Sequence, residues 1–178
     1  MRLIIGLVIL VLPCLLCCKS TELKDRSSSQ WIDETVNLYA FIGKKISVIE
    51  FDPNKSNTKI AIDSISGDTI RKVRHVMDSG FICRYKVLKN VFNRLETDTI
   101  EFKAYDHYGR PGFENYTNVL LYLSKSSDDS EFFHQKYQYD VVYNSKNGSW
   151  NGENGESIAD LFRAKRNGVF RERKVFNE

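Results

Sequence analysis

From residue 31 onward, apolar side chains recur mostly at every second position, the spacing that places alternate side chains on one face of a β-strand. Apolar residues alternate from Val36 to Ile42, and the pattern resumes at Ile46 after Gly43. Because a lone glycine in a strand often marks a bulge, this stretch predicts either two strands around a turn or one long strand bent at Gly43. A shorter strand is expected over residues 59–64.

Strand patterns continue through the middle of the chain. One run begins at Phe81 and extends toward residue 92, and a strand with one solvated face is predicted over residues 99–104. Residues 119–123 are apolar at every position, which predicts a central strand buried on both faces. A long strand is expected over residues 133–143, and Asn147-Gly148 predicts a turn after it.

One helix is expected near the C-terminus. Ser157, followed three residues later by Asp160, is typical of a helix start, and Asn167-Gly168 predicts the stop. The apolar stripe between them consists of Ile158, Leu161 and Phe162. We expect this stripe to pack against one end or edge of the sheet.

These elements predict a mainly β fold in which residues 31–178 form a single globular domain. The expected architecture is a small curved sheet or a partly open barrel with one C-terminal helix. The order of a long bent first strand, a hairpin and a later central strand resembles the oligonucleotide/oligosaccharide-binding (OB) barrel. A two-sheet sandwich and an open α+β sheet are the alternatives. Because one fold carries many functions, the resemblance concerns architecture alone.

The first seventeen residues have the composition of a signal peptide. Arg2 supplies a positive charge, and the apolar run over residues 3–12 is too short to cross a bilayer as a helix of about 20 residues. Residues 15–18, Leu-Leu-Cys-Cys, then resemble the lipobox of bacterial lipoprotein precursors. An ordinary secretory signal, which would release a secreted protein, is the alternative.

Carried over position by position, Leu15 is the lipobox leucine, Cys17 stands in the small-residue position, and Cys18 carries the lipid. The resemblance therefore implies a domain anchored to the cell envelope. The chain then divides into a signal peptide (1–17), a lipidated flexible tether (18–30) and the globular domain (31–178). Lys19 stands where enteric lipoproteins retained in the inner membrane have aspartate, so the resemblance favours the outer membrane.

The net charge limits the class of partner, and the position of the one cysteine in the body indicates its environment. Without residues 1–17 the net charge is +2, against +3 for the whole chain, because Arg2 is the one charged residue removed. This balance predicts no nucleic-acid partner, since affinity for phosphate backbones needs an excess of basic charge on one face. Cys83 stands alone in the body among apolar neighbours, which predicts a buried thiol.

One stretch concentrates polar and aromatic side chains at the exit of a strand. The candidate binding residues are Tyr105, Asp106, His107, Tyr108 and Arg110. Loops held by a rigid sheet often carry binding sites, although an exposed hairpin loop is the other interpretation. A second aromatic set is either core or a surface that stacks against sugars or binds a peptide. It consists of Tyr137, Tyr139 and Tyr143 together with Phe132, Phe133 and Trp150.

The sequence does not support hydrolase chemistry, because it has neither the G-x-S-x-G nor the H-E-x-x-H motif. His75, His107 and His134 lie on separate predicted elements, so we expect no metal site and no cofactor. The expected role is noncatalytic binding or a structural role in the envelope. The expected partners are the membrane, which the lipid anchor would enter, and an envelope protein or glycan. The alternatives are a surface enzyme around Asp106, His107 and Arg110, and a secreted inhibitor or immunity-type protein.

Overall fold

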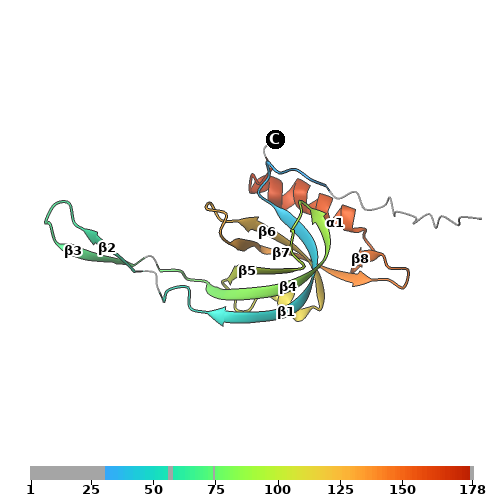
Figure 1. The fold of residues 1–178 in the computed structure, drawn as a ribbon, viewed down its shortest axis with the longest axis horizontal. Helices are drawn as coiled ribbons and strands as arrows, with labels where there is room; N and C mark the ends of the chain where they lie inside the picture. The colour runs from blue at the N-terminus through green and yellow to red at the C-terminus, as the bar shows by residue number, and fades with distance from the viewer. Residues whose placement is uncertain (1–30, 56–57, 74, 177–178) are drawn as a thin grey trace, which may run out of the picture.

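The computed structural model describes residues 31–55, 58–73 and 75–176, and its fold is mainly β with one C-terminal helix (Figure 1). Cys18, the predicted signal peptide and the predicted tether lie outside the described residues. The strands are β1 (Tyr39–Phe51), β2 (Thr58–Ile62), β3 (Thr69–Val73), β4 (Ser79–Phe92), β5 (Thr99–Asp106), β6 (Asn118–Lys125), β7 (Phe132–Asn144) and β8 (Trp150–Gly152). The helical segments are the 3-10 turn η1 (Gly112–Asn115), the helix α1 (Ile158–Lys165) and the π-helical turn η2 (Arg166–Phe170).

Six strands form one curved sheet in the order β5-β4-β1-β6-β7-β8. Neighbours along this order pair antiparallel. A single parallel pair, Lys103 opposite Phe133, also joins β5 to β7, so the sheet curls until its two sides meet. The predicted curved sheet or partly open barrel is therefore confirmed.

The strand β6 separates two hydrophobic cores because both of its faces are buried. Its residues Val119, Leu121 and Leu123 belong to the core inside the barrel. Leu120 and Tyr122 belong to a second core on the outer face of the sheet. All five side chains are 0% exposed, which confirms the predicted central strand.

The barrel interior also buries two polar side chains of β4. Burial raises the pKa of the Cys83 thiol to about 12, so the thiol stays protonated and packs as a small apolar group, as predicted. The hydroxyl of Tyr85 is buried without a hydrogen-bond partner among the described residues. Gly43 makes room for this ring, because a Cβ at residue 43 would lie 2.8 Å from the ring of Phe41 and 3.1 Å from that of Tyr85.

The first strand is one long bent strand, which decides between the two predictions for this region. In its pairing with β4, Ile42 lies opposite Lys89 and Gly43 opposite Val87, so the register shifts by one residue at this point. The first half of β1 pairs with β6 as well as β4, whereas the second half pairs with β4 alone. The bulge therefore marks where β1 begins to leave the barrel wall.

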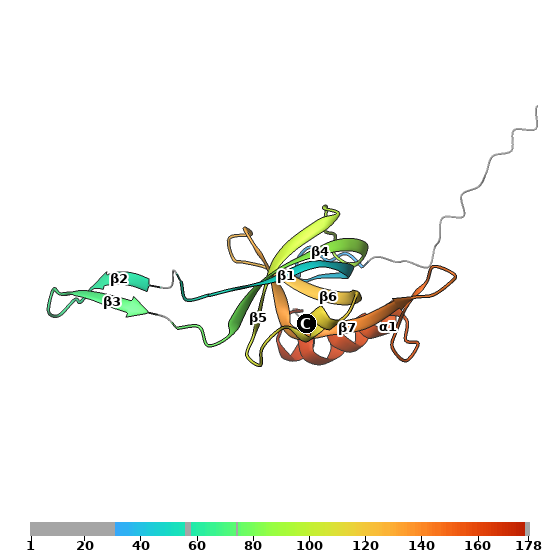
Figure 2. The same cartoon turned by 90° about the horizontal axis from the view of Figure 1, so that it is seen from below.

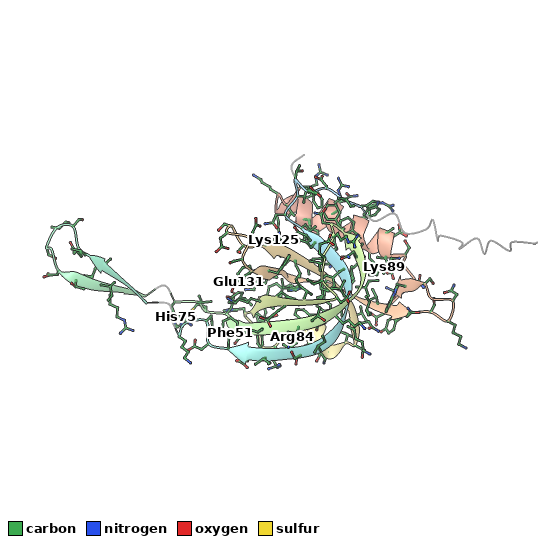
Figure 3. All side chains as sticks on the ribbon, in the orientation of Figure 1. Phe51, His75, Arg84, Lys89, Lys125 and Glu131 are labelled. Carbon is green, nitrogen blue, oxygen red and sulfur yellow. The ribbon has the colours of Figure 1, made fainter. Side chains whose placement is uncertain are left out.

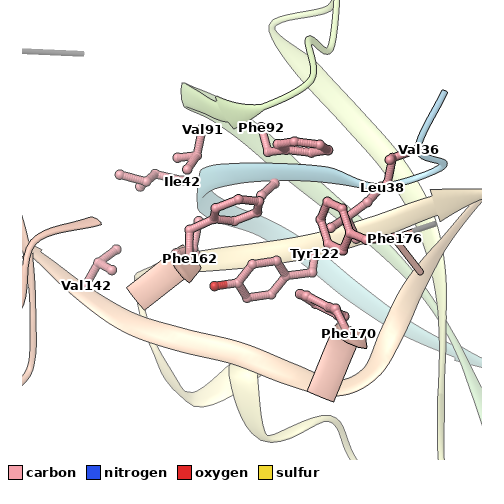
Figure 4. Close-up of a cluster of buried hydrophobic side chains, with 12 residues drawn as sticks. Val36, Leu38, Ile42, Val91, Phe92, Tyr122, Val142, Phe162, Phe170 and Phe176 are labelled. Atoms are coloured by element: carbon pink, nitrogen blue, oxygen red, sulfur yellow. The ribbon is translucent and has the colours of Figure 1, made fainter. Parts of the chain in front are cut away.

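The C-terminal helix packs on the outer face of the barrel, where Phe162 is its central side chain (Figure 4). The ring of Phe162 lies 5.0 Å from those of Trp31 and Phe92 and 6.5 Å from that of Tyr122, measured between centroids. Phe170 contacts Tyr122 at 5.1 Å from the other side. Since complete burial of a large apolar side chain contributes about 1.5–3 kcal/mol, Phe162 and Phe170 account for much of the attachment of the helix.

Ser157 caps this helix as predicted, because its Oγ accepts a hydrogen bond from the backbone N–H of Asp160. The regular α-helix ends at Lys165 and Gly168 has a non-helical backbone (φ −98°, ψ −109°), which confirms the predicted stop at Asn167-Gly168. Past this kink the chain continues and places Phe170 in the outer core. No helix within the described ranges has the length and apolarity needed to span a membrane.

An arm, residues 52–78 with the hairpin β2–β3, projects from the barrel between β1 and β4 (Figures 1 and 2). Figure 3 places Phe51 and His75 at the junction of the arm and the barrel. Asn54 closes this junction, because its side chain exchanges hydrogen bonds of 2.9 and 2.8 Å with the backbone of Val76. The hairpin itself forms a separate two-stranded sheet.

The hairpin exposes large apolar side chains: Ile60, Ile62 and Ile65 are 76%, 74% and 97% exposed. The sequence predicted β2 but not β3, because the Thr-Ile-Arg-Lys-Val stretch of β3 carries little apolar alternation. Isolated two-stranded hairpins are marginally stable in water, since three or more strands or a packing partner are usually needed. The arm is thus the part of the described fold with the least internal support.

Residues 31–38 cross the far end of β4, where Asn93 fastens them. The backbone N–H of Asn93 donates to the carbonyl of Trp31, and the Asn93 amide donates to the carbonyls of Asp33, Val36 and Leu38 at 2.8–3.0 Å. Asn93 has φ 48°, a left-handed conformation that asparagine adopts more readily than most residues. The first described residues therefore lie at the end of β4 opposite the arm.

Candidate functional site

The loop after β5 turns sharply, as its glycine and proline predicted. Oδ1 of Asp106 accepts a hydrogen bond of 2.9 Å from the backbone N–H of Tyr108, which closes a local turn. Gly109 follows with φ 120°, and Pro111 precedes the 3-10 turn η1. The loop is held against the end of the sheet where Asp106 pairs with Ser79 at the base of the arm.

A pocket of about 270 Å³ opens between this loop and β7. Four of the five predicted binding residues line it, namely Tyr105, Asp106, Tyr108 and Arg110, whereas His107 lies outside it. Its walls are mainly aromatic and also include Phe113, His134, Tyr137 and Tyr139. Burial raises the pKa of the Tyr105 and Tyr139 hydroxyls, so both remain protonated hydrogen-bond donors at neutral pH.

The far wall of the pocket is a wide bulge in β7. Leu121 of β6 pairs with Tyr139 and Leu123 pairs with His134, so the four residues 135–138 stand opposite Tyr122 alone. Within this bulge Tyr137 has φ 66°, which is unusual for a bulky aromatic residue. Such strained residues cost about 1–3 kcal/mol and persist where the surrounding structure holds them.

The bulge places the ring of Tyr137 at the mouth of the pocket. The ring is 43% exposed, and its centroid lies 6.1 Å from that of Tyr108, which is 86% exposed, with 34° between the ring planes. Beneath them Tyr139 contacts Phe113 at 6.1 Å. Gly112 allows this packing, because a Cβ there would lie 2.7 Å from the hydroxyl of Tyr139.

His134 forms part of the pocket wall as a neutral ring. Its Nε2 lies 2.8 Å from the carbonyl of Gln138, and because a carbonyl only accepts, Nε2 carries the proton. The imidazole packs against Phe113, with 4.6 Å between ring centroids. Burial and the nearby Arg173 lower the pKa of His134 to about 4, against the opposing effect of the Gln138 hydrogen bond.

Arg110 is held by an extensive set of partners. Its guanidinium donates to both carboxylate oxygens of Glu114 at 2.7 and 2.9 Å and to the carbonyl of Val48 at 2.9 Å. It lies 3.8 Å from Glu50 and above the ring of Phe81. The bond to Glu114 is the main reason that the pKa of Arg110 is raised. Arg110 therefore fixes the loop to the open edge of β1.

His107 belongs to a different cluster. Its Nδ1 lies 3.3 Å from Asp78, whose second carboxylate oxygen accepts a hydrogen bond of 2.6 Å from Lys136. This bond from Lys136 is the main cause of the lowered pKa of Asp78. The cluster ties the base of the arm to the β7 bulge. Asp106, His107 and Arg110 therefore do not converge on one point.

Among residues 31–55, 58–73 and 75–176, no group of three or more His, Cys, Asp and Glu side chains is placed to hold a metal ion. The tyrosines of the second predicted aromatic set divide between two environments. Tyr137 and Tyr139 line the pocket, whereas Tyr143 is 52% exposed elsewhere on β7. Next to it Val142 is buried in the outer core.

Sequence reasoning missed Phe113 and His134 as pocket residues. Phe113 follows the loop in an otherwise polar stretch, and the alternation over residues 133–143 predicts a regular strand on which His134 is one of the polar positions. A signal for Phe113 existed in its position directly after Pro111-Gly112, where a short turn folds back on the sheet. No local signal marks the β7 bulge, because it arises from pairing with β6.

Comparisons of this chain with protein-family models, with curated proteins and with solved structures find no match.

Acidification is expected to destabilise the fold through His134. Its folded pKa of about 4 lies below the value of 6.5 expected when unfolded, so its contribution is complete above pH 6.5 and is lost as the pH falls toward 4. The loss amounts to at most about 3 kcal/mol. Urea unfolding from pH 4 to 7 should show a shallower pH dependence for His134→Gln than for the wild type. Parallel curves for the two proteins would contradict the assignment, and His75→Gln, at an exposed position of the arm, serves as the control.

Proposed function

We propose that this chain is a lipid-anchored, noncatalytic binding domain of the bacterial cell envelope, and that the aromatic pocket is its ligand site. The observation that carries the proposal is Tyr137. Its backbone is strained, and its ring stands half-exposed at the mouth of a pocket opposite Tyr108. Strain of this kind clusters at functional sites, because a purely structural position gains nothing by keeping it.

The pocket chemistry fits a ligand with a flat apolar face and a few polar groups. Exposed tyrosine rings stack against such faces, and their hydroxyls supply hydrogen bonds. A sugar ring of an envelope glycan or a side chain of an envelope protein has this character. The pocket volume of about 270 Å³ lies just below the usual range of ligand sites, about 300–1,000 Å³. This size favours a ligand of which a single sugar or amino-acid residue enters the pocket.

The ionic groups support binding in preference to catalysis. Arg110 is engaged by Glu114, and Lys136 by Asp78, so both cations are held in fixed ion pairs. The lowered pKa of His134 keeps its ring neutral at pH 7, and its Nε2 is committed to Gln138. A general acid or base needs a pKa near the working pH and a free path to the substrate.

The position of the pocket suits a domain tethered at its N-terminus. Trp31 pairs with Phe92 at one end of β4, whereas Asp106 of the pocket pairs with Ser79 at the other. A strand of this length extends about 40 Å. A lipid on Cys18 would therefore hold the domain from the end of β4 that is opposite the pocket.

Tyr137→Gly tests the site without a loss of folding. Glycine accepts φ 66° freely, so the free energy of unfolding should stay within about 1 kcal/mol of the wild type or rise. Tyr143→Gly, in the same strand but at a position with an ordinary backbone conformation, should lower the free energy of unfolding.

NMR titration with neutral oligosaccharides, short peptides and small organic solutes should shift the amide signals of pocket residues in the wild type and in Tyr143→Gly but not in Tyr137→Gly. Chemical turnover of a bound ligand, or shifts confined to other surfaces, would refute the proposal.

Loss of the lipid should release the protein from the membrane. Cys18→Ser removes the thiol that would carry acyl chains, each buried CH₂ of which contributes about 0.8 kcal/mol to membrane binding. Fractionation should move the variant to the soluble fraction, and intact-mass measurement should show added acyl mass on the wild type alone. Cys17→Ser is the matched control and should remain at the membrane. Membrane retention of Cys18→Ser would argue against the anchor.

We also propose that the arm serves an envelope-structural role by contacting a protein partner. The exposed Ile60, Ile62 and Ile65 favour this second function, since large apolar side chains on a bare hairpin gain stability from a partner. A photo-crosslinking residue at position 65 should capture a protein in intact cells, whereas one at the exposed Glu153 should not. Capture of lipid alone at position 65 would point to membrane contact instead.

A further inference from the structure

The charges at the pocket distinguish between charged and neutral ligands, which its aromatic walls alone would not do. Asp106 lines the pocket, and its Oδ1 accepts the N–H of Tyr108. Within the described part of the chain, no lysine, arginine or histidine forms an ion pair with this carboxylate. The pocket thus contains one negative charge that no side chain balances.

Two of the positive groups nearby are paired with carboxylates. Arg110 faces the carboxylates of Glu114 and Glu50, and Lys136 faces Asp78. His134 adds no charge at neutral pH, because its pKa is lowered to about 4. Arg173, which donates to the carbonyl of Lys136, adds one positive charge. Three positive side chains then stand against the four carboxylates of Glu114, Glu50, Asp78 and Asp106, so the pocket and its rim carry an excess of one negative charge that a bound cation would offset.

The aromatic rings supply the second element of a cation site. Cations bind over the faces of tyrosine and phenylalanine when they lie within about 6 Å of the ring centroid. Tyr108 and Tyr137 lie side by side at the mouth of the pocket, 6.1 Å apart with a tilt of 34°. The Lys136 ammonium lies 5.2 Å from the centroid of Tyr137, so one cation already uses this ring and a ligand cation would use the remaining ring faces of the pocket. Tyr105, Phe113 and Tyr139 complete the walls below.

We propose that this pocket binds an organic cation whose charge is spread over methyl groups, of which the quaternary ammonium of choline is the simplest form. The proposal rests on the pocket being the ligand site and names the class of ligand. A quaternary ammonium is weakly hydrated and has an apolar surface, so it loses little on entering aromatic walls. A neutral sugar would use the rings but would leave the charge of Asp106 unmatched.

The test uses the purified mature protein in a nonionic polyoxyethylene detergent, with choline and its neutral isostere 3,3-dimethyl-1-butanol as probes. The two probes share shape and differ in charge. Calorimetry or NMR titration should show choline binding at least about tenfold more tightly than the isostere, since cation–π and carboxylate contacts together exceed about 1.4 kcal/mol. Equal affinities for the two probes would overturn the proposal.

Two variants separate the contribution of the Asp106 charge to binding from that of the aromatic walls. Asp106→Asn keeps an oxygen for the N–H of Tyr108, so the loop should fold, and it should weaken choline binding about tenfold while leaving the isostere unchanged. Tyr108→Leu should weaken both probes. Asp128→Asn, at an exposed turn, is the matched control and should change neither. Unchanged choline affinity in Asp106→Asn would refute the cation site.

Two further probes distinguish the source of the ammonium group. Tighter binding of glycerophosphocholine than of choline would support a lipid headgroup, and the reverse order would support a free solute. If neutral oligosaccharides shift the amides of Tyr108 and Tyr137 while choline does not, the cation proposal fails and the ligand site stands. If no probe shifts these amides, both fail.

Discussion

Burial of β6 on both faces is the constraint on which the rest of this structure depends. Leu121 faces the barrel interior, and Tyr122 faces the opposite way, yet neither is exposed. A strand that is apolar on both sides needs cover on both sides. The sheet supplies one cover by curling until β5 reaches β7, and the C-terminal helix supplies the other through Phe162 and Phe170. The curl and the helix therefore follow from the same short apolar run.

The outer core also supports the pocket on the opposite side of β7. The Tyr122 hydroxyl donates a hydrogen bond of 2.7 Å to Asp140, and Lys165 of the helix lies 3.5 Å from the same carboxylate. Arg173 donates to the carbonyl of Lys136 inside the bulge at 3.0 Å. These contacts hold the strand on either side of Tyr137 and offset the cost of its backbone conformation. The shape of the pocket is thus tied to helix packing.

The ion pairs around the pocket hold its loop and the β7 bulge in place. The pairing of Arg110 with Glu114 fixes the loop to β1, and Asp78 joins the arm base to Lys136 in the β7 bulge. The first pair engages Arg110, which the sequence marked as a candidate binding residue. What remains for a ligand is a set of aromatic faces and the carboxylate of Asp106. Rigid walls with few free charges are suited to recognition, because they need little reorganisation on binding.

Local sequence determined the elements whose signals are local: the apolar run 119–123, the Ser157 cap and the turn after β5 are all readable from neighbouring residues. Periodicity, capping and turn chemistry act over a few positions, so they can be recognised without knowledge of the fold. Tertiary structure alone decided that residues 135–138 bulge and that His134 lies in a pocket wall. It also decided that His107 turns away from the pocket toward Asp78. These features depend on strand register and on partners distant in the chain, which no local pattern specifies.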